Sequence, residues 1–106
     1  MDFEFIDFSV QDAVGWFRYN RPPVNAVHWP MLRELPGALS AVLGDPSVRV
    51  LVLASALKKY FAVGADLEVF RGIDEAGMTE WVDRSLEIMH LLQQSEKPVL
   101  AAINGT

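Results

Sequence analysis

The stretch FAVGADL, residues 61–67, has residue types that suggest chemistry, although it carries only one ionisable side chain. It follows the apolar run VLVLAS, residues 50–55, and places a glycine where the backbone can turn sharply and a ligand can come close. If a helix begins at Asp66 or Leu67, the N–H of Ala65 lies near its positive end and can donate to a developing oxyanion. An ordinary strand-to-helix turn explains the same residues, and local physics alone favours that explanation.

Two carboxylates, Asp66 and Glu68, stand two positions apart. On a helix they point to different sides, which makes them a poor acid–base pair. Asp66 precedes LEVFRG, a candidate short helix, and its carboxylate can accept from the free N–H groups of that helix. We therefore predict that Asp66 is a structural cap and not a catalytic group.

The sequence lacks the common catalytic signatures. It has no G-x-S-x-G nucleophile motif, no G-x-G-x-x-G and no Walker loop. The two histidines, His28 and His90, lie far apart and have no metal-ligand spacing, so we assign His28 a capping or surface role and His90 a helix-surface role. The absence of cysteine excludes disulfides, a thiol nucleophile and Cys-based metal sites. We predict no metal site.

Composition places the chain among globular proteins. It has 106 residues, of which 51% are hydrophobic and 22% charged, and this length suits one domain or less. The net charge of −5 disfavours nucleic acid as a partner. No apolar stretch approaches the roughly 20 residues of a membrane span, and the acidic N-terminus is no signal peptide. These features are compatible with a cytoplasmic protein without a membrane partner.

Hydrophobic periodicity predicts the element order β-β-α-β-α-β. Pro30 suits the first turn of the first helix and Gly44 its C-terminal cap, whereas Pro36 predicts a kink or a break. Because apolar strands alternate with helices, we expect an α/β fold in which residues 48–54 and 99–103 are neighbouring parallel strands, both buried. The predicted elements are strands over 3–10, 14–20, 48–54 and 98–103, and helices over 28–44 and 74–96.

Four segments occur in an order and at a spacing that resemble the N-terminal part of the crotonase superfamily, the enoyl-CoA hydratase/isomerase family. They are NRPPVNAV, DPSVRVLVLAS, YFAVGADLEVF and KPVLAAING. The resemblance covers nearly the whole chain, up to Gly105, and implies a partial crotonase (ββα spiral) fold. It also implies that residues 1–106 are the N-terminal portion of a larger domain, truncated after the strand 98–103 and inactive alone.

The resemblance implies a site for an acyl-CoA thioester, which is a substrate and not a cofactor. In that family the thioester oxygen binds between two backbone N–H groups, which stabilise an enolate. The first donor is the residue after the loop glycine, which here is Ala65. The implied coenzyme A contacts are Pro23, Val24, Lys59, Val63, Ala65 and Leu67.

The sequence departs from the family pattern in two loop positions. Val63 stands where alanine is common. Glu68 replaces a frequent lysine, which should weaken attraction for the coenzyme A phosphates or redirect the path of coenzyme A. The second oxyanion donor and the catalytic carboxylates of the family are expected beyond Thr106.

Several functions therefore stay open. They are an enoyl-CoA hydratase, an enoyl-CoA isomerase, an acyl-CoA thioester hydrolase, and a non-catalytic acyl-CoA-binding or assembly module. The family commonly forms trimers or dimers of trimers, so the resemblance implies a homo-oligomer, trimeric or hexameric, for the full-length form.

Overall fold

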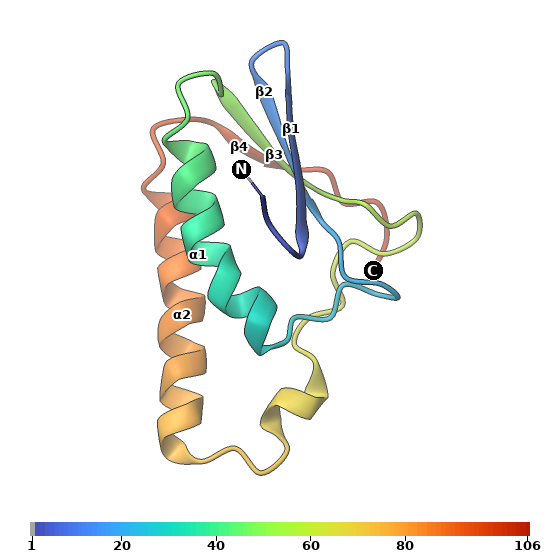
Figure 1. Cartoon of the computed structure of the whole chain (residues 1–106), viewed down its shortest axis with the longest axis vertical. Helices are drawn as coiled ribbons and strands as arrows, with labels where there is room; N and C mark the ends of the chain where they lie inside the picture. The colour runs from blue at the N-terminus through green and yellow to red at the C-terminus, as the bar shows by residue number, and fades with distance from the viewer. Residues whose placement is uncertain (1) are drawn as a thin grey trace.

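The computed structural model describes residues 2–106 and contains one four-stranded sheet with two helices (Figure 1). The observed order confirms the predicted β-β-α-β-α-β arrangement, and the candidate short helix in LEVFRG is a 3₁₀ helix. The elements are β1 (Ile6–Gln11), β2 (Val14–Tyr19), α1 (Trp29–Leu43), β3 (Val50–Ser55), η1 (Leu67–Phe70), α2 (Glu75–Gln93) and β4 (Val99–Ala101).

The sheet has the strand order β1-β2-β3-β4. β1 and β2 form the predicted antiparallel hairpin, joined by Asp12 and Ala13, which both adopt positive φ as a type I′ turn requires. β2 pairs with β3 in parallel, and β3 pairs with β4 in parallel. The prediction that residues 48–54 and 99–103 hold neighbouring parallel strands is therefore confirmed.

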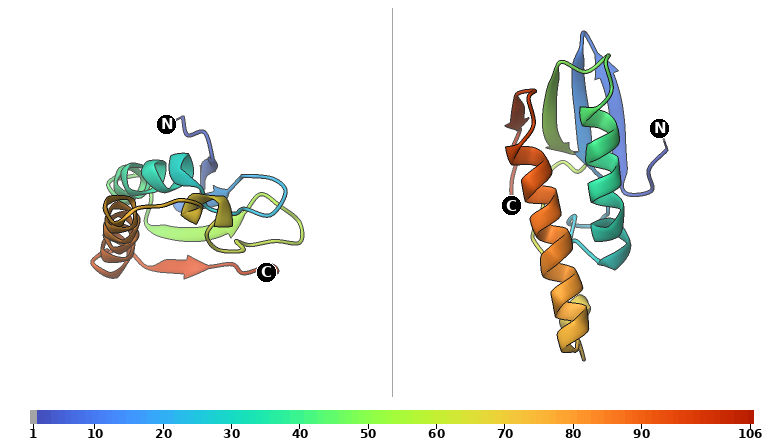
Figure 2. Two further views of the ribbon diagram at one scale, coloured as in Figure 1. Left: turned by 90° about the horizontal axis from the view of Figure 1, so that it is seen from below. Right: turned by 90° about the vertical axis from the view of Figure 1, so that its left-hand side faces the viewer.

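The two helices lie side by side and cover the same face of the sheet (Figures 1 and 2). Within the core, Phe17, Met31, Leu39, Val42 and Leu51 are almost completely buried. Each such side chain contributes about 1.5–3 kcal/mol by leaving water. The core therefore fixes the sheet and α1 relative to each other, and the loops that follow β2 and β3 start from a rigid base.

Of the two outcomes predicted at Pro36, a kink or a break, the break is wrong, because α1 continues through it. An interior proline removes one helical hydrogen bond and costs about 3 kcal/mol. Leu35, Ala38 and Leu39 flank this position and are buried in the core. Their burial outweighs the local cost. Pro30 and Gly44 take the predicted positions in the first turn and at the C-cap.

The last strand differs from the prediction in length and in burial. β4 comprises only residues 99–101, and Leu100 is 58% exposed. It lies at the edge of the sheet, and within residues 2–106 its outer edge has no partner strand. The expectation of a buried strand over 98–103 is therefore wrong for this chain, whereas Leu51 to Ala54 of β3 are buried as predicted.

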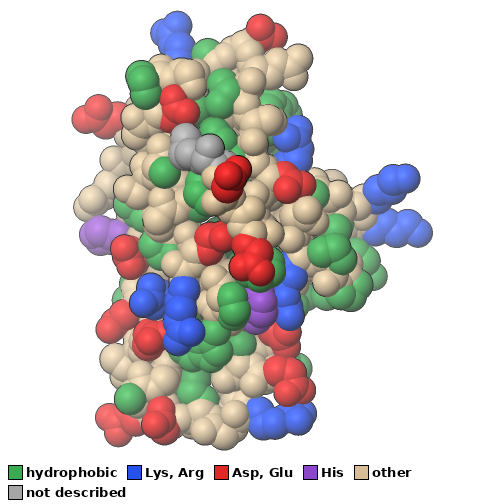
Figure 3. All heavy atoms as spheres, in the orientation of Figure 1, with side chains coloured by type: hydrophobic (Ala, Val, Ile, Leu, Met, Phe, Trp, Pro, Cys, Tyr) green, Lys and Arg blue, Asp and Glu red, His purple; other side chains and the backbone are tan. Residues whose placement is uncertain are grey.

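The apolar face of α2 is likewise only partly buried. Ile88, Leu91 and Leu92 pack against the core, whereas Leu86 and Met89 are 60% and 52% exposed. Neither helix within residues 2–106 is long and apolar enough to cross a membrane. On the face shown in Figure 3, charged side chains of both signs are interspersed among the apolar ones.

We expect the isolated chain to self-associate at micromolar concentration, because apolar surface on α2 and β4 faces water. Sedimentation velocity over a concentration series measures this. Replacing Leu86 and Met89 together by lysine should shift the distribution toward monomer. A wild-type chain that sediments as a compact monomer throughout the series would contradict the prediction.

Candidate functional site

Two loops meet beside the carboxyl ends of β2 and β3. A parallel bridge joins Val27, in the loop after β2, to Ala65, in the loop after β3. The Val27 N–H donates to the Gly64 carbonyl over 2.9 Å, and the Asp66 N–H donates to the Val27 carbonyl over 2.8 Å. A parallel bridge uses the groups on either side of Ala65, so the N–H of Ala65 itself points away from Val27.

The N–H of Ala65 has no hydrogen-bond acceptor within residues 2–106, whereas the Gly64 carbonyl and the Asp66 N–H on either side of it are paired with Val27. Gly64 supports this geometry with a φ of 101°, a conformation that residues with a side chain rarely adopt. A β-carbon at Gly64 would meet nothing within 4 Å. The glycine is therefore needed for its backbone conformation and not for lack of space.

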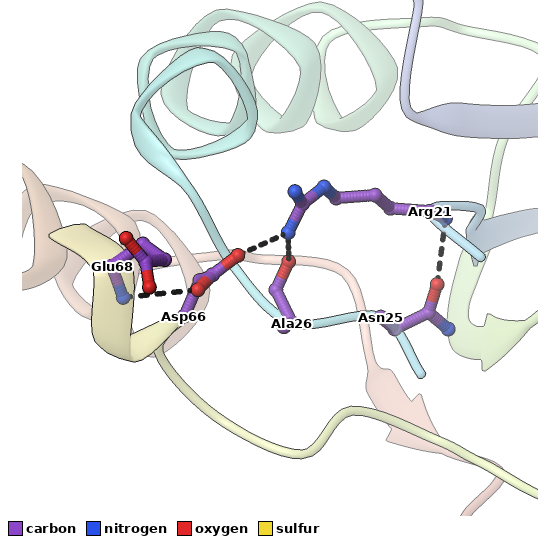
Figure 4. A network of polar contacts seen from close by, with 5 residues as sticks. All are labelled: Arg21, Asn25, Ala26, Asp66 and Glu68. Atoms are coloured by element: carbon purple, nitrogen blue, oxygen red, sulfur yellow. Dashed lines mark hydrogen bonds and ion pairs between the residues drawn. The ribbon is translucent and has the colours of Figure 1, made fainter. Parts of the chain in front are cut away.

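Asp66 begins η1 as its N-cap residue, the structural role predicted from the sequence. Its Oδ1 accepts from the Glu68 N–H over 3.1 Å, and its Oδ2 accepts from Arg21 Nη1 over 2.9 Å (Figure 4). The hydrogen bond from Arg21, followed by that from Glu68, lowers the pKa of Asp66 below its ordinary value. Asp66 is thus held ionised, which suits an anchor better than a proton donor. η1 has only four residues, so the helix end adds little field to the Ala65 amide.

The sequence analysis missed the two polar residues that hold the first loop. Arg21 Nη1 donates to the Ala26 carbonyl over 2.8 Å in addition to Asp66. Asn25 is completely buried, and its Oδ1 accepts from the Arg21 backbone N–H over 2.7 Å. Its Nδ2 donates to the Phe61 carbonyl at 2.8 Å. The sequence signal that could have identified Asn25 was an amide side chain in a mostly apolar, proline-rich loop.

A pocket of about 400 Å³ lies where the two loops meet. It brings together five of the predicted contact residues, Pro23, Val24, Val63, Ala65 and Leu67. Most of its wall is apolar, so a hydrogen bond made inside it competes with less water than one on the open surface. The full lining is Arg21, Pro22, Pro23, Val24, Ala26, Val63, Ala65, Asp66 and Leu67.

Lys59 is not part of this lining. Its side chain is exposed, and its backbone lies against the C-terminal segment. A β-carbon at Gly105 would collide with the Lys59 carbonyl, while the Asn104 side chain donates to the Leu57 carbonyl over 2.9 Å. The Phe61 N–H donates to the Thr106 carbonyl over 2.6 Å. The end of the described chain therefore runs along the start of the Ala65 loop.

The histidines lie outside the pocket. His28 occupies the N-cap position of α1, but its side chain makes no capping hydrogen bond, so the side-chain capping role is wrong. Its ring packs edge-on against Phe5 with 4.7 Å between centroids, and burial, followed by the charge of Arg21, lowers its pKa. His90 is exposed on α2, as predicted. No group of three metal-ligating side chains occurs in the described part of the chain.

The ion pair predicts a pH-dependent difference between the wild type and Asp66→Asn. The pKa of Asp66 is lowered, so its ionised form stabilises the fold above the ordinary aspartate pKa, and this contribution disappears as the pH falls through the folded value. The variant keeps a capping oxygen but loses the charge. The difference in melting temperature should be constant near neutral pH and shrink below about pH 4. A difference that persists undiminished into acid would contradict this assignment.

Comparison with known proteins gives a consistent result. The sequence profile described as Enoyl-CoA hydratase/isomerase matches residues 9–106. The chain is 30% identical to the crotonyl-CoA hydratase of Syntrophomonas wolfei, over 99% of this chain and 41% of the relative. The crystal structure of an enoyl-CoA hydratase from Bacillus anthracis superimposes with a TM-score of 0.87 at 30% identity, over 96% of this chain and 40% of that one.

A second branch of activity is represented among the similar structures. The human mitochondrial delta3-delta2-enoyl-CoA isomerase superimposes with a TM-score of 0.89 at 27% identity, over 97% of this chain and 41% of that one. The chain thus spans about two fifths of the length of the relatives that it matches.

Proposed function

The chain belongs to the enoyl-CoA hydratase/isomerase family, and on that premise we propose that it forms the acyl-CoA-binding part of an enoyl-CoA hydratase. Because it spans about 41% of a crotonyl-CoA hydratase, we further propose that it is the N-terminal part of an enzyme of that full length. That enzyme is called the whole protein below. Its substrate is a 2-enoyl-CoA thioester, and no separate cofactor is required.

One observation carries this proposal: the unpaired N–H of Ala65 in the wall of a mostly apolar pocket. Ala65 is half-buried and lines the pocket, so its N–H, which makes no hydrogen bond within residues 2–106, can donate to a ligand bound there. Here the hydrogen bonds of Gly64 and Asp66 to Val27 hold Ala65 in place without using its N–H. We infer that this donor is kept for the thioester oxygen of the substrate.

The chemistry requires such a donor. Addition of water to the double bond of a 2-enoyl-CoA moves negative charge onto the thioester oxygen, which becomes an enolate oxygen. A fixed N–H stabilises that oxygen more in the transition state than in the ground state, and a mostly apolar wall strengthens the effect. Pro23, Val24, Val63 and Leu67 would contact the coenzyme A moiety along the same pocket.

Lys59 would act from outside the pocket lining. Its exposed side chain stands outside the pocket lining, so contact with a coenzyme A phosphate would occur at the rim and would be screened by salt. Homo-oligomer formation, as a trimer or hexamer of the whole protein, also remains a proposal.

An enoyl-CoA isomerase is the second candidate, since the human mitochondrial delta3-delta2-enoyl-CoA isomerase matches this fold at a TM-score of 0.89. Both reactions pass through a thioester enolate, so both need the Ala65 N–H. The two reactions differ in the acid and base that transfer protons at carbon. Within residues 2–106 the pocket lining presents one carboxylate, Asp66, and Arg21 donates a hydrogen bond to it.

The test compares substrates on the whole protein. Hydration of crotonyl-CoA, isomerisation of a 3-enoyl-CoA and hydrolysis of an acyl-CoA are measured side by side. We expect hydration to have the highest kcat/KM. Faster isomerisation would favour the second candidate, and faster hydrolysis would assign a thioesterase. Tight binding of butyryl-CoA with no turnover of any substrate would indicate a non-catalytic binding module.

A further inference from the structure

The unpaired amide of Ala65 is held by a set of contacts that converge on one side chain. Arg21 Nη1 donates to the Ala26 carbonyl over 2.8 Å and to Asp66 Oδ2 over 2.9 Å (Figure 4). Ala26 precedes Val27, and Asp66 follows Ala65, so the guanidinium joins the two loops directly beside the Val27–Ala65 bridge. The Arg21 and Asp66 side chains are only 28% and 25% exposed.

The backbone bridge alone is a weak constraint. It consists of two neutral hydrogen bonds between irregular loops, and such bonds each contribute little net stability. Around it, Gly64 has a positive φ and no packing contact at the position of a β-carbon. A charge-assisted bond is roughly twice as strong as a neutral one, so the Arg21 contact adds the strongest single tie between the loops.

We propose that Arg21 is a positioning residue, which fixes the direction of the Ala65 N–H by tying Asp66 and the Ala26 carbonyl to one guanidinium. This inference rests on the proposed function of the Ala65 amide. Arg21 acts through Asp66 and does not touch the reacting atoms. Loss of the tie lets residues 64–66 rotate, so the donor is misdirected when the enolate forms.

A competing role for Arg21 makes a different prediction. Its side chain also lines the pocket, and within residues 2–106 its guanidinium has no hydrogen bond other than the two on Nη1. It could therefore contact a phosphate of coenzyme A directly. In that case its removal would weaken ground-state binding, whereas a misdirected oxyanion donor mainly lowers kcat.

The experiment compares Arg21→Met and Arg21→Lys with Arg33→Met in the whole protein. Arg33 pairs with Glu80 across α1 and α2 at 3.1 Å, and both side chains are exposed, so it controls for loss of one arginine ion pair. We expect Arg21→Met to lower kcat by about 10–10²-fold. The affinity for butyryl-CoA should stay within about threefold, because coenzyme A contacts other residues. Arg21→Lys should recover part of kcat, and Arg33→Met should behave as wild type.

Hydrogen exchange measured by mass spectrometry provides a readout besides activity. In Arg21→Met, peptides that cover residues 24–28 and 64–67 should exchange faster, because the amides of Val27 and Asp66 lose protection. Peptides from β2 and β3 should be unchanged. Faster exchange throughout the protein would instead show a general loss of stability and would overturn the positioning role.

A double-mutant cycle with Asp66→Asn tests whether Arg21 acts through Asp66. The double variant should lose no more kcat than the larger of the two single variants. Additive losses, or a loss of butyryl-CoA affinity equal to the loss in kcat/KM, would overturn the proposal. If instead removal of the Ala65 N–H itself leaves kcat unchanged, the proposed function fails, and the exchange result still reports separately on the loop tie.

Discussion

Replacement of Ala65 by proline is expected to lower kcat of the whole protein by about 10²–10³-fold, the usual contribution of one oxyanion donor. Proline lacks the N–H, which in the wild type has no acceptor within residues 2–106. The substitution therefore removes no hydrogen bond that holds the fold together. Steady-state kinetics with crotonyl-CoA measure the effect.

Two measurements separate chemistry from misfolding in this variant. Proline restricts the conformation of the residue before it, and Gly64 already has an unusual φ of 101°. Circular dichroism and butyryl-CoA binding report whether the loop and pocket survive. The matched control is Ala65→Gly, which keeps the N–H and should keep kcat within about tenfold, the loss reflecting a looser loop. A folded Ala65→Pro variant with wild-type kcat would refute the oxyanion role.

The ion pair with Arg21 also affects the activity that is expected of Asp66→Asn. As a helix cap alone, Asp66 should tolerate this change with most activity retained. The ion pair with Arg21 at 2.9 Å means that the variant keeps the cap but places an uncharged group against the guanidinium. We now expect a moderate loss of kcat, similar to that of Arg21→Met. If Asp66→Asn abolished turnover while Ala65→Pro remained active and folded, the carboxylate would be the catalytic group.

Replacement of Asn25 by alanine is expected to reduce the free energy of unfolding by about 3 kcal/mol or more. Asn25 is completely buried, and its side chain bonds to the Arg21 N–H, the Ser55 hydroxyl and the Phe61 carbonyl. The variant leaves these groups without their partner inside the protein, where each unsatisfied group costs about 1–3 kcal/mol. Urea denaturation of the whole protein measures the change.

The matched comparison is Asn25→Gly. Asn25 has a φ of 57°, so alanine adds a backbone cost of about 1–2 kcal/mol that glycine avoids. Both variants lose the same side-chain hydrogen bonds, and glycine should therefore be the less destabilising of the two. Equal stability of Asn25→Ala and the wild type would mean that water replaces the amide and that the loop is not anchored by this residue.

Hydrophobic periodicity within each segment was enough to predict the strands and helices of this fold that have long, regular patterns. The alternation of β1 and β2, the apolar run of β3 and the 3.6-residue period of α1 each reflect burial of one face, whereas α2 buries only part of its apolar face. The parallel pairing of β3 with β4 then follows from the helical crossover between them, which lets the chain enter the second strand in the direction of the first. The cap at Asp66 could also be predicted, because it depends only on a hydrogen bond to the N–H of Glu68, two residues away.

Burial by distant residues decided the rest. Pro36 stays helical because Leu35 and Leu39 are buried, and no local pattern records how much that packing outweighs a missing hydrogen bond. The low burial of β4 could not be predicted either, because its apolar composition is that of a covered strand.

The sequence by itself determined that a glycine-containing loop follows a buried strand, and its resemblance to the family predicted Ala65 as an oxyanion donor. Only the tertiary structure decided which groups hold that loop. Arg21 and Asp66 are 45 positions apart, and Asn25 and Phe61 are 36 apart, so neither contact leaves a periodic trace in the sequence. Hydrogen bonds between distant loops depend on where the core has placed the strand ends, and that placement exists only after folding.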